Sequence, residues 1–100
     1  MLKSVGLKTR SFASAEEFLR SGHQSDTACL ITDVHMPGMN GLELQATLAE
    51  EDYRIPIIFI TAYGDAKTRM HAMTGGAVEF LVKPFNDDAL LESVRAALDM

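Results

Sequence analysis

The chain has 100 residues, of which 47% are hydrophobic, and this is enough for one compact domain but too short for two. Asp and Glu (14) outnumber Lys and Arg (9), and the formal net charge of −5 argues against a surface that follows nucleic-acid phosphates. The single cysteine, Cys29, excludes an internal disulfide, and no stretch approaches the roughly 20 apolar residues of a membrane span. We therefore expect one soluble, cytoplasmic domain over residues 1–100.

The first third of the chain predicts a strand, a helix and a second strand. Residues 7–12 alternate loosely between polar and apolar side chains, which indicates a short exposed strand at the edge of a sheet. Ser14 and Glu17 have the spacing of a capping box, so a helix should begin at Ser14, and Gly22 can end it. The apolar run of residues 28–33 predicts a strand that is covered on both faces.

The remainder of the chain alternates between helical and strand patterns. Helices are expected from about Leu42, over residues 65–74 and after the N-cap residue Asn86. We expect the second of these to bury Ala66, Met70 and Met73, and the third to bury Leu90, Leu91, Val94 and Leu98. Strands are expected over residues 57–60 and 78–82. The alternation predicts an α/β fold, a parallel sheet with helices on both faces.

Three polar residues follow successive predicted strands, namely Asp33, Thr61 and Lys83. Any one of them alone would usually be an ordinary loop residue, but the carboxyl edge of an open parallel sheet is where ligands bind. Together they provide a carboxylate that can accept a phosphoryl group, a hydroxyl that can donate to its oxygens, and an ammonium that can pair with its charge. The sequence thus favours a phosphoacceptor site at this edge.

The motifs DVHMPGMNGLEL, IPIIFITA and FLVKPF, which hold these three residues, closely resemble the receiver domain of bacterial response regulators of the FixJ/NarL-like group. The resemblance implies a flavodoxin-like receiver fold in a two-component phosphorelay. It also implies that Asp33 takes phosphate from a histidine kinase, that Thr61 and Lys83 bind the phosphoryl group, and that Phe80 is an aromatic switch. Asp33 and the backbone carbonyl of His35 would be Mg²⁺ ligands. DNA would be contacted only through an output domain, which these residues do not include.

Several local features bear on this resemblance. Gly38 and Gly41 permit unusual backbone angles in the loop after Asp33. The family usually holds the Lys83–Pro84 bond cis, and we predict cis here, although only about 5–6% of such bonds are cis in folded proteins. From the residues alone Phe80 would be an ordinary core aromatic. The His35 side chain has no second ligand at metal-binding spacing and should point to solvent.

One part of the family pattern is missing. The family begins with a strand that ends in two metal-binding acids and continues into a first helix, whereas residues 2–6 resemble the end of that helix. Glu16 and Glu17 cannot replace the acids because they lie in a capping turn. We therefore expect four strands from this chain and an incomplete Mg²⁺ site. We also expect residues 7–12 either to pair directly with residues 28–33 or to be exchanged in a homodimer.

Three other functions compete with this interpretation of the sequence. The first is an interaction module that dimerises, without phosphorylation, through its last helix, its last strand and the helix before that strand. The second is a phosphatase with Asp33 as nucleophile, but the expected second aspartate is replaced by His35. The third is a flavin-binding module, which would need a phosphate-binding loop after the first strand. The signalling reading predicts no enzyme beyond phosphorylation and dephosphorylation of the domain itself.

Overall fold

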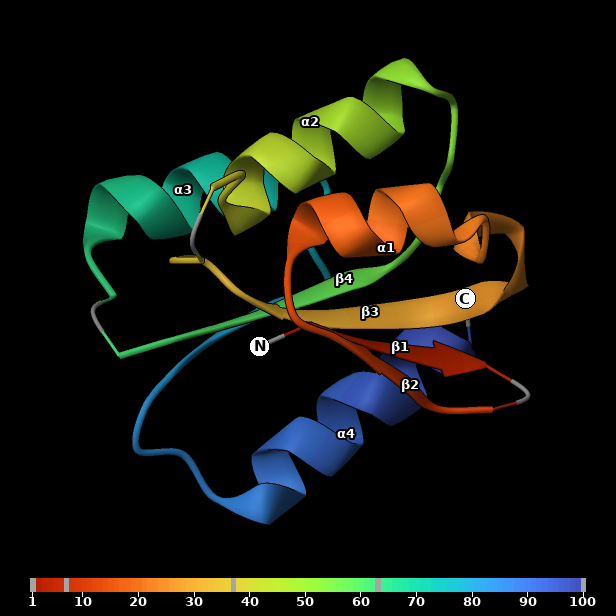
Figure 1. The fold of residues 1–100 in the computed structure, drawn as a ribbon. Helices are drawn as coiled ribbons and strands as arrows, with labels where there is room; N and C mark the ends of the chain where they lie inside the picture. The colour runs from red at the N-terminus through yellow and green to blue at the C-terminus, as the bar shows by residue number, and fades with distance from the viewer. Residues whose placement is uncertain (1, 7, 37, 63, 100) are drawn as a thin grey trace.

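The computed structural model describes residues 2–6, 8–36, 38–62 and 64–99. These residues form a five-stranded sheet in the order β2-β1-β3-β4-β5. The strands are β1 (Leu2–Gly6), β2 (Arg10–Phe12), β3 (Thr27–Asp33), β4 (Ile57–Thr61) and β5 (Glu79–Val82). The helices are α1 (Ala15–Ser21), α2 (Gly41–Glu50), α3 (Ala66–Thr74) and α4 (Asp87–Leu98), with a 3₁₀ turn over Gln24–Asp26. Helices α1, α2 and α3 cover one face and α4 covers the other (Figure 1).

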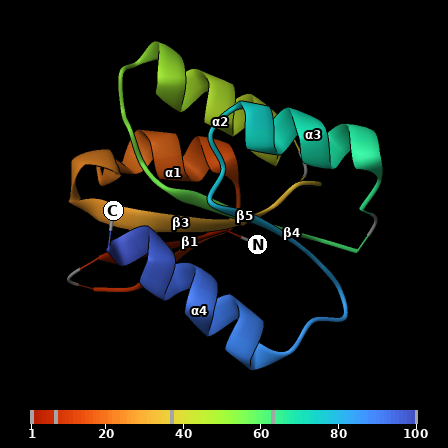
Figure 2. The same cartoon turned by 180° about the vertical axis from the view of Figure 1, so that it is seen from behind.

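The three strands that carry the predicted site are parallel, as the sequence predicted. β3 pairs with β4, with Asp33 opposite Ile60, and β4 pairs with β5, with Thr61 opposite Val82. Because the strands run the same way, their carboxyl ends meet at one edge of the sheet. Seen from behind, β4 and β5 lie between α3 on one face and α4 on the other (Figure 2). The flavodoxin-like fold class is confirmed.

The N-terminal residues depart from the prediction. Instead of a helix end, Leu2–Gly6 form β1, which lies between β2 and β3 and is antiparallel to both. The expected four strands are therefore five among the described residues. The predicted pairing of residues 7–12 with residues 28–33 is also wrong, because Arg10–Phe12 pair with β1 and form the sheet edge. Leu7 lies outside the described residues.

Residues 2–6 form a strand because the backbone of β3 needs hydrogen-bond partners on this side. An interior position beside a buried strand leaves N–H and C=O groups that must find partners. β1 supplies them from the same chain, with Leu2 opposite Thr32 and Val5 opposite Cys29. Its side chains fit the position, since Leu2 is completely buried and Ser4 is only 3% exposed. A reversed strand thus fills the interior position that the family gives to its first strand.

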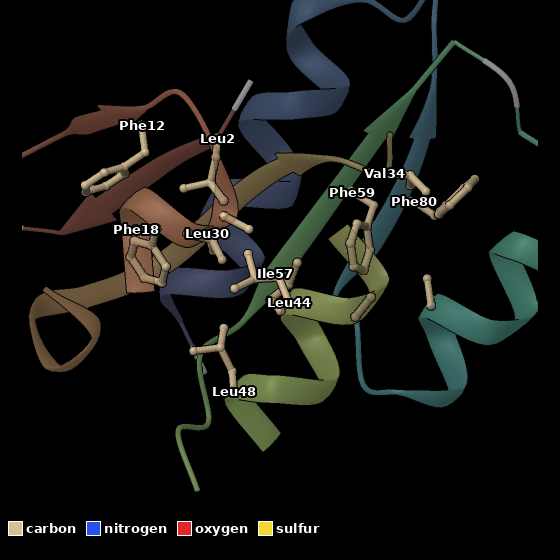
Figure 3. Close-up of a cluster of buried hydrophobic side chains, with 13 residues drawn as sticks. Leu2, Phe12, Phe18, Leu30, Val34, Leu44, Leu48, Ile57, Phe59 and Phe80 are labelled. Atoms are coloured by element: carbon tan, nitrogen blue, oxygen red, sulfur yellow. The ribbon is translucent and has the colours of Figure 1, made fainter. Parts of the chain in front are cut away.

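The core is divided between the two faces of the sheet. The larger cluster lies under α1, α2 and α3, where Phe18, Phe59, Leu44 and Leu48 are buried together with Leu2 (Figure 3). The smaller cluster lies between the sheet and α4, and it contains Cys29, Ile31, Ile58, Ile60 and Ala97. Burial on both faces explains the continuous apolar runs of β3 and β4.

The helix starts follow the predicted caps. Ser14 Oγ accepts from Glu17 N–H at 3.1 Å, and Gly22 ends α1 with a φ of 76°. The reciprocal half of the capping box differs, because Glu17 Oε2 accepts from the N–H of Ala13 rather than that of Ser14. Asn86 caps α4 through a hydrogen bond from Ala89 N–H.

The predicted inward faces of α3 and α4 are partly wrong. Ala66 is exposed, Met70 and Met73 are 70% and 39% exposed, and α3 buries Ala72 instead. In α4, Leu91 and Leu98 are 54% and 47% exposed, whereas Ser93 and Ala97 are buried. Small residues at the contact let a helix backbone approach the sheet closely, so longer side chains on the flanks stay in solvent. In the described part of the chain, no helix is long and apolar enough to cross a membrane.

Candidate functional site

The three predicted site residues lie at one edge of the sheet. Asp33 is the last residue of β3, Thr61 is the last residue of β4, and Lys83 follows β5 directly. With His35 and Ala62 they line one pocket of about 200 Å³. Residues that are up to fifty positions apart in the sequence therefore line a single cavity, because the carboxyl ends of parallel strands lie at the same edge of the sheet.

An ion pair joins two of these residues. Lys83 Nζ lies 3.6 Å from Asp33 Oδ1, and the two side chains are 49% and 20% exposed. The backbone of Lys83 is fixed as well, because its N–H donates to the Thr61 carbonyl at 2.8 Å. The Lys83–Pro84 peptide bond is cis, which confirms the prediction. The ammonium is thus placed beside the carboxylate, while the pocket stays open to solvent.

The loop between β3 and α2 holds backbone groups close to Asp33. Gly41 N–H donates to the Val34 carbonyl at 2.8 Å, and a Cβ on Gly41 would lie only 2.7 Å from the Asp33 carbonyl oxygen. Gly38 has a φ of 75°, which only glycine adopts without strain. The prediction of an unusual angle holds for Gly38, whereas Gly41 is required because of close contact.

His35 is exposed, in agreement with the predicted solvent-facing side chain, and it also lines the Asp33 pocket. Asp65 caps α3, and its Oδ1 accepts from Thr68 N–H at 2.6 Å. This backbone hydrogen bond is the main reason why the pKa of Asp65 is lowered, and a hydrogen bond with the Thr68 side chain lowers it further. The backbone carbonyl of His35 as a metal ligand stays a prediction.

The described residues do not fit the Mg²⁺ site that the resemblance implies. Nowhere among them do three His, Cys, Asp or Glu side chains come together closely enough to hold a metal ion. The pocket contributes one carboxylate, that of Asp33. Mg²⁺ demands near-octahedral oxygen coordination and gives up its waters reluctantly, so a single carboxylate and a carbonyl make a weak site. The positive charge in this pocket comes from Lys83.

Phe80 lies inside the core. It belongs to β5, is 2% exposed, and lies near Val34, the residue after β3 (Figure 3). A Cβ on Gly64, in the loop that follows β4, would lie 3.3 Å from the Phe80 ring. The ring therefore packs against the segment that follows Thr61. This position suits either an ordinary core aromatic or a switch, and the switch stays a prediction.

Sequence reasoning missed one residue near the site. Glu16 Oε1 accepts from the N–H of Met39, in the loop after Asp33, at 3.0 Å. From the capping pattern, Glu16 was predicted only to lie in the first turn of α1. A contact between residues 23 positions apart has no signal in helical spacing, because it depends on how α1 lies against the loop.

Comparisons with known proteins show what the whole chain is similar to. The model of the response regulator receiver domain family matches residues 1–95. Nodulation protein W of Bradyrhizobium diazoefficiens is 48% identical over 99 residues, which cover 99% of this chain and 44% of that protein. The transcriptional regulatory protein FixJ of Azorhizobium caulinodans is 42% identical over 98 residues, covering 98% of this chain and 46% of that protein.

Solved structures give the same result. The crystal structure of FixJ-N has a TM-score of 0.79 and 38% identity, and the match covers 90% of this chain and 72% of that one. The response regulator StyR has a TM-score of 0.80 and 44% identity, covering 88% of this chain and 44% of that one. The chain thus spans less than half the length of the two relatives named above.

Proposed function

This chain belongs to the response regulator receiver domain family, the signalling domains of two-component systems, and we propose that Asp33 is its phosphoacceptor. The observation that carries the proposal is the 3.6 Å ion pair of Lys83 Nζ with Asp33 Oδ1 in the pocket that Thr61 also lines. A nucleophilic carboxylate, a fixed cation and a hydroxyl are the groups that phosphoryl transfer to an aspartate requires.

In the proposed reaction, a carboxylate oxygen of Asp33 attacks the phosphorus of a phosphohistidine on a histidine kinase. The new O–P bond forms as the N–P bond breaks, and the released imidazole nitrogen takes up a proton. Lys83 offsets the negative charge that gathers on the phosphoryl oxygens, and the Thr61 hydroxyl donates to one of them. Both groups are held by the ends of adjacent parallel strands, so little reorganisation is needed when the phosphoryl group arrives.

The remaining parts of the proposal concern partners. A histidine kinase would dock at the open edge around Asp33, and phosphorylation would change a protein–protein surface of the domain. FixJ is named as a transcriptional regulatory protein, and this chain matches less than half of its length. We infer that any contact with DNA belongs to an output domain outside the matched region. The net charge of −5 supports this division, since acidic side chains outnumber basic ones in this chain.

Beryllofluoride, which binds an aspartyl carboxylate as a phosphoryl mimic, tests the proposal. Amide NMR spectra would be recorded for the wild-type chain and for Asp33→Asn, each with and without Mg²⁺. We expect shifts at Thr61, Ala62 and Lys83 in the wild type and none in the variant. If beryllofluoride causes the same shifts in both proteins, or none in either, Asp33 does not have this role.

A second candidate function is supported by the exposed apolar side chains. Met70 on α3, Val82 on β5, and Leu91 and Leu98 on α4 are between 41% and 70% exposed. These are the three elements through which the phosphorylation-independent interaction module would dimerise. Analytical ultracentrifugation separates the two functions. A dimer that forms without phosphate and is lost in Leu91→Glu would favour the module, whereas a dimer that requires beryllofluoride would favour the receiver.

A further inference from the structure

The loop after the phosphoacceptor is held from outside by one carboxylate. Glu16, in the first turn of α1, accepts through Oε1 from Met39 N–H at 3.0 Å. Its other oxygen, Oε2, faces the neighbouring residue, where a Cβ on Gly38 would lie only 2.5 Å away. One oxygen of Glu16 therefore binds the backbone of this loop, and the other lies close beside Gly38.

The support for Glu16 is rigid. Ala15 and Phe18, its neighbours on α1, are completely buried in the main core cluster, and the Ser14 cap fixes the start of the helix. Glu16 as a residue is half-buried. A hydrogen bond from a backbone amide to a charged acceptor is roughly twice as strong as one between neutral groups. Through this hydrogen bond, Glu16 fixes the position of the loop relative to α1.

The loop in turn carries residues of the Asp33 pocket. Its first residue, Val34, is anchored because its N–H donates to the Ile60 carbonyl at 3.1 Å and because it is only 3% exposed. His35 follows directly and lines the pocket with Asp33. At the far end, the capping box of Asn40 and Glu43 fixes the start of α2. Glu16 holds the stretch between these two anchors.

We propose that Glu16 is a positioning residue for the phosphoacceptor site, which holds the loop after β3 so that His35 and its backbone stay in place beside Asp33. The proposal rests on the proposed function, because it assigns Glu16 a part in phosphorylation of Asp33. It also makes a claim about the loop alone, which can be read without phosphate. Gly38 belongs to the same device, since any side chain there would displace the Glu16 carboxylate.

The test compares Glu16→Ala, Glu16→Gln and Glu92→Ala. Glu16→Gln keeps an oxygen acceptor without the charge, and Glu92→Ala removes an exposed acid from α4, on the opposite face of the sheet. Three quantities are measured for each protein: hydrogen exchange of the Met39 amide, the amide shifts of His35 and Lys83, and the rate of phosphorylation by acetyl phosphate. Circular dichroism verifies that each variant is folded.

We expect the Met39 amide of Glu16→Ala to exchange at least about tenfold faster, as for loss of a hydrogen bond to a charged group. Phosphorylation should slow, and the His35 and Lys83 amides should shift. Glu16→Gln, which keeps a neutral acceptor, should reverse part of each change, and Glu92→Ala should behave as wild type. Unchanged Met39 exchange would overturn the proposal. So would faster exchange with wild-type phosphorylation and wild-type shifts at His35 and Lys83, because Glu16 would then hold the loop without positioning the site.

The two proposals fail in different ways. If the wild-type chain takes no phosphate, the proposed function fails, and the pocket shifts alone decide the role of Glu16. Shifts of His35 and Lys83 in Glu16→Ala that Glu16→Gln reverses would then still support the positioning role. Shifts confined to Met39 and its neighbours would overturn it.

Discussion

Leu2 of β1 lies opposite Thr32 of β3 in an antiparallel pair, so the amino end of β1 is at the edge of the sheet where Asp33 ends β3. The carboxyl end of β1, at Gly6, lies opposite Thr27 at the far edge. In the family pattern, the strand in this position arrives at the Asp33 edge with two acids. Here the strand runs the other way, and the residues with which it ends are carried away from the site.

The first prediction concerns metal binding. With one carboxylate in the pocket, we expect a Mg²⁺ titration to shift the amides around Asp33 only weakly and without saturation, because Mg²⁺ needs more fixed oxygen ligands than the pocket supplies. NMR titration with MgCl₂ measures this, with NaCl at matched ionic strength as the control. Saturable shifts that disappear in Asp33→Asn would show that a metal site exists after all.

The second prediction concerns the cation beside Asp33. Lys83→Gln should slow phosphorylation by acetyl phosphate about a hundredfold, the effect expected when one group that stabilises the developing oxyanion is removed. Its stability should change by less than about 1 kcal/mol, because solvent-exposed ion pairs contribute little. Lys67→Gln, which removes an exposed cation from α3, is the matched control and should retain the wild-type rate. Equal rates for the two variants would exclude a special role for Lys83.

The third prediction concerns the reversed strand. Leu2 is completely buried among Phe12, Phe18 and Leu30, so Leu2→Ala should lower the free energy of unfolding by about 2–5 kcal/mol (Figure 3). Leu98 is 47% exposed, and Leu98→Ala should cost about 0.5 kcal/mol or less. Urea unfolding measures both. If the two variants lose the same small amount, β1 does not hold the interior position in solution.

The fourth prediction concerns Cys29. Burial raises the pKa of its thiol from 9.0 to about 11, a shift that a hydrogen bond from the Leu30 backbone only partly offsets. The folded chain therefore favours the neutral thiol, and the unfolded chain ionises first as the pH rises. Stability due to this group is complete below pH 9.0 and is lost as the pH approaches about 11.

Urea unfolding over this pH range measures the loss, with Cys29→Ala as the reference. The wild type should lose stability more steeply than the variant, and parallel curves would contradict the burial argument. Below pH 9.0 the folded wild type should also resist thiol reagents, because Cys29 is completely buried.

The sequence was sufficient to predict the strands that build the site. β3, β4 and β5 are largely apolar, and the polar residues at their carboxyl ends, Asp33, Thr61 and Lys83, meet as parallel strands require. Periodicity within each segment and the order of the segments were enough, and β3 and β4 in addition are buried on both faces.

The sequence was not sufficient for β1, because Leu-Lys-Ser-Val-Gly has no strong pattern of its own. Its conformation is decided by the hydrogen-bonding groups of β3 and by the place left beside them. The exposure of Met70 and Leu91 was missed for a related reason. A helical period allows more than one inward face, and the small residues Ala72 and Ala97 decided which one packs. The contact of Glu16 with Met39 likewise depends on tertiary packing.

The most direct test of the account is the mass of the intact chain after incubation with acetyl phosphate. The account predicts that the wild type gains one phosphoryl group, that peptide mapping places it on Asp33, and that Asp33→Asn gains none. A wild-type chain whose mass does not change, or an Asp33→Asn variant that gains the same mass, would contradict the central claim that this pocket accepts phosphate on Asp33.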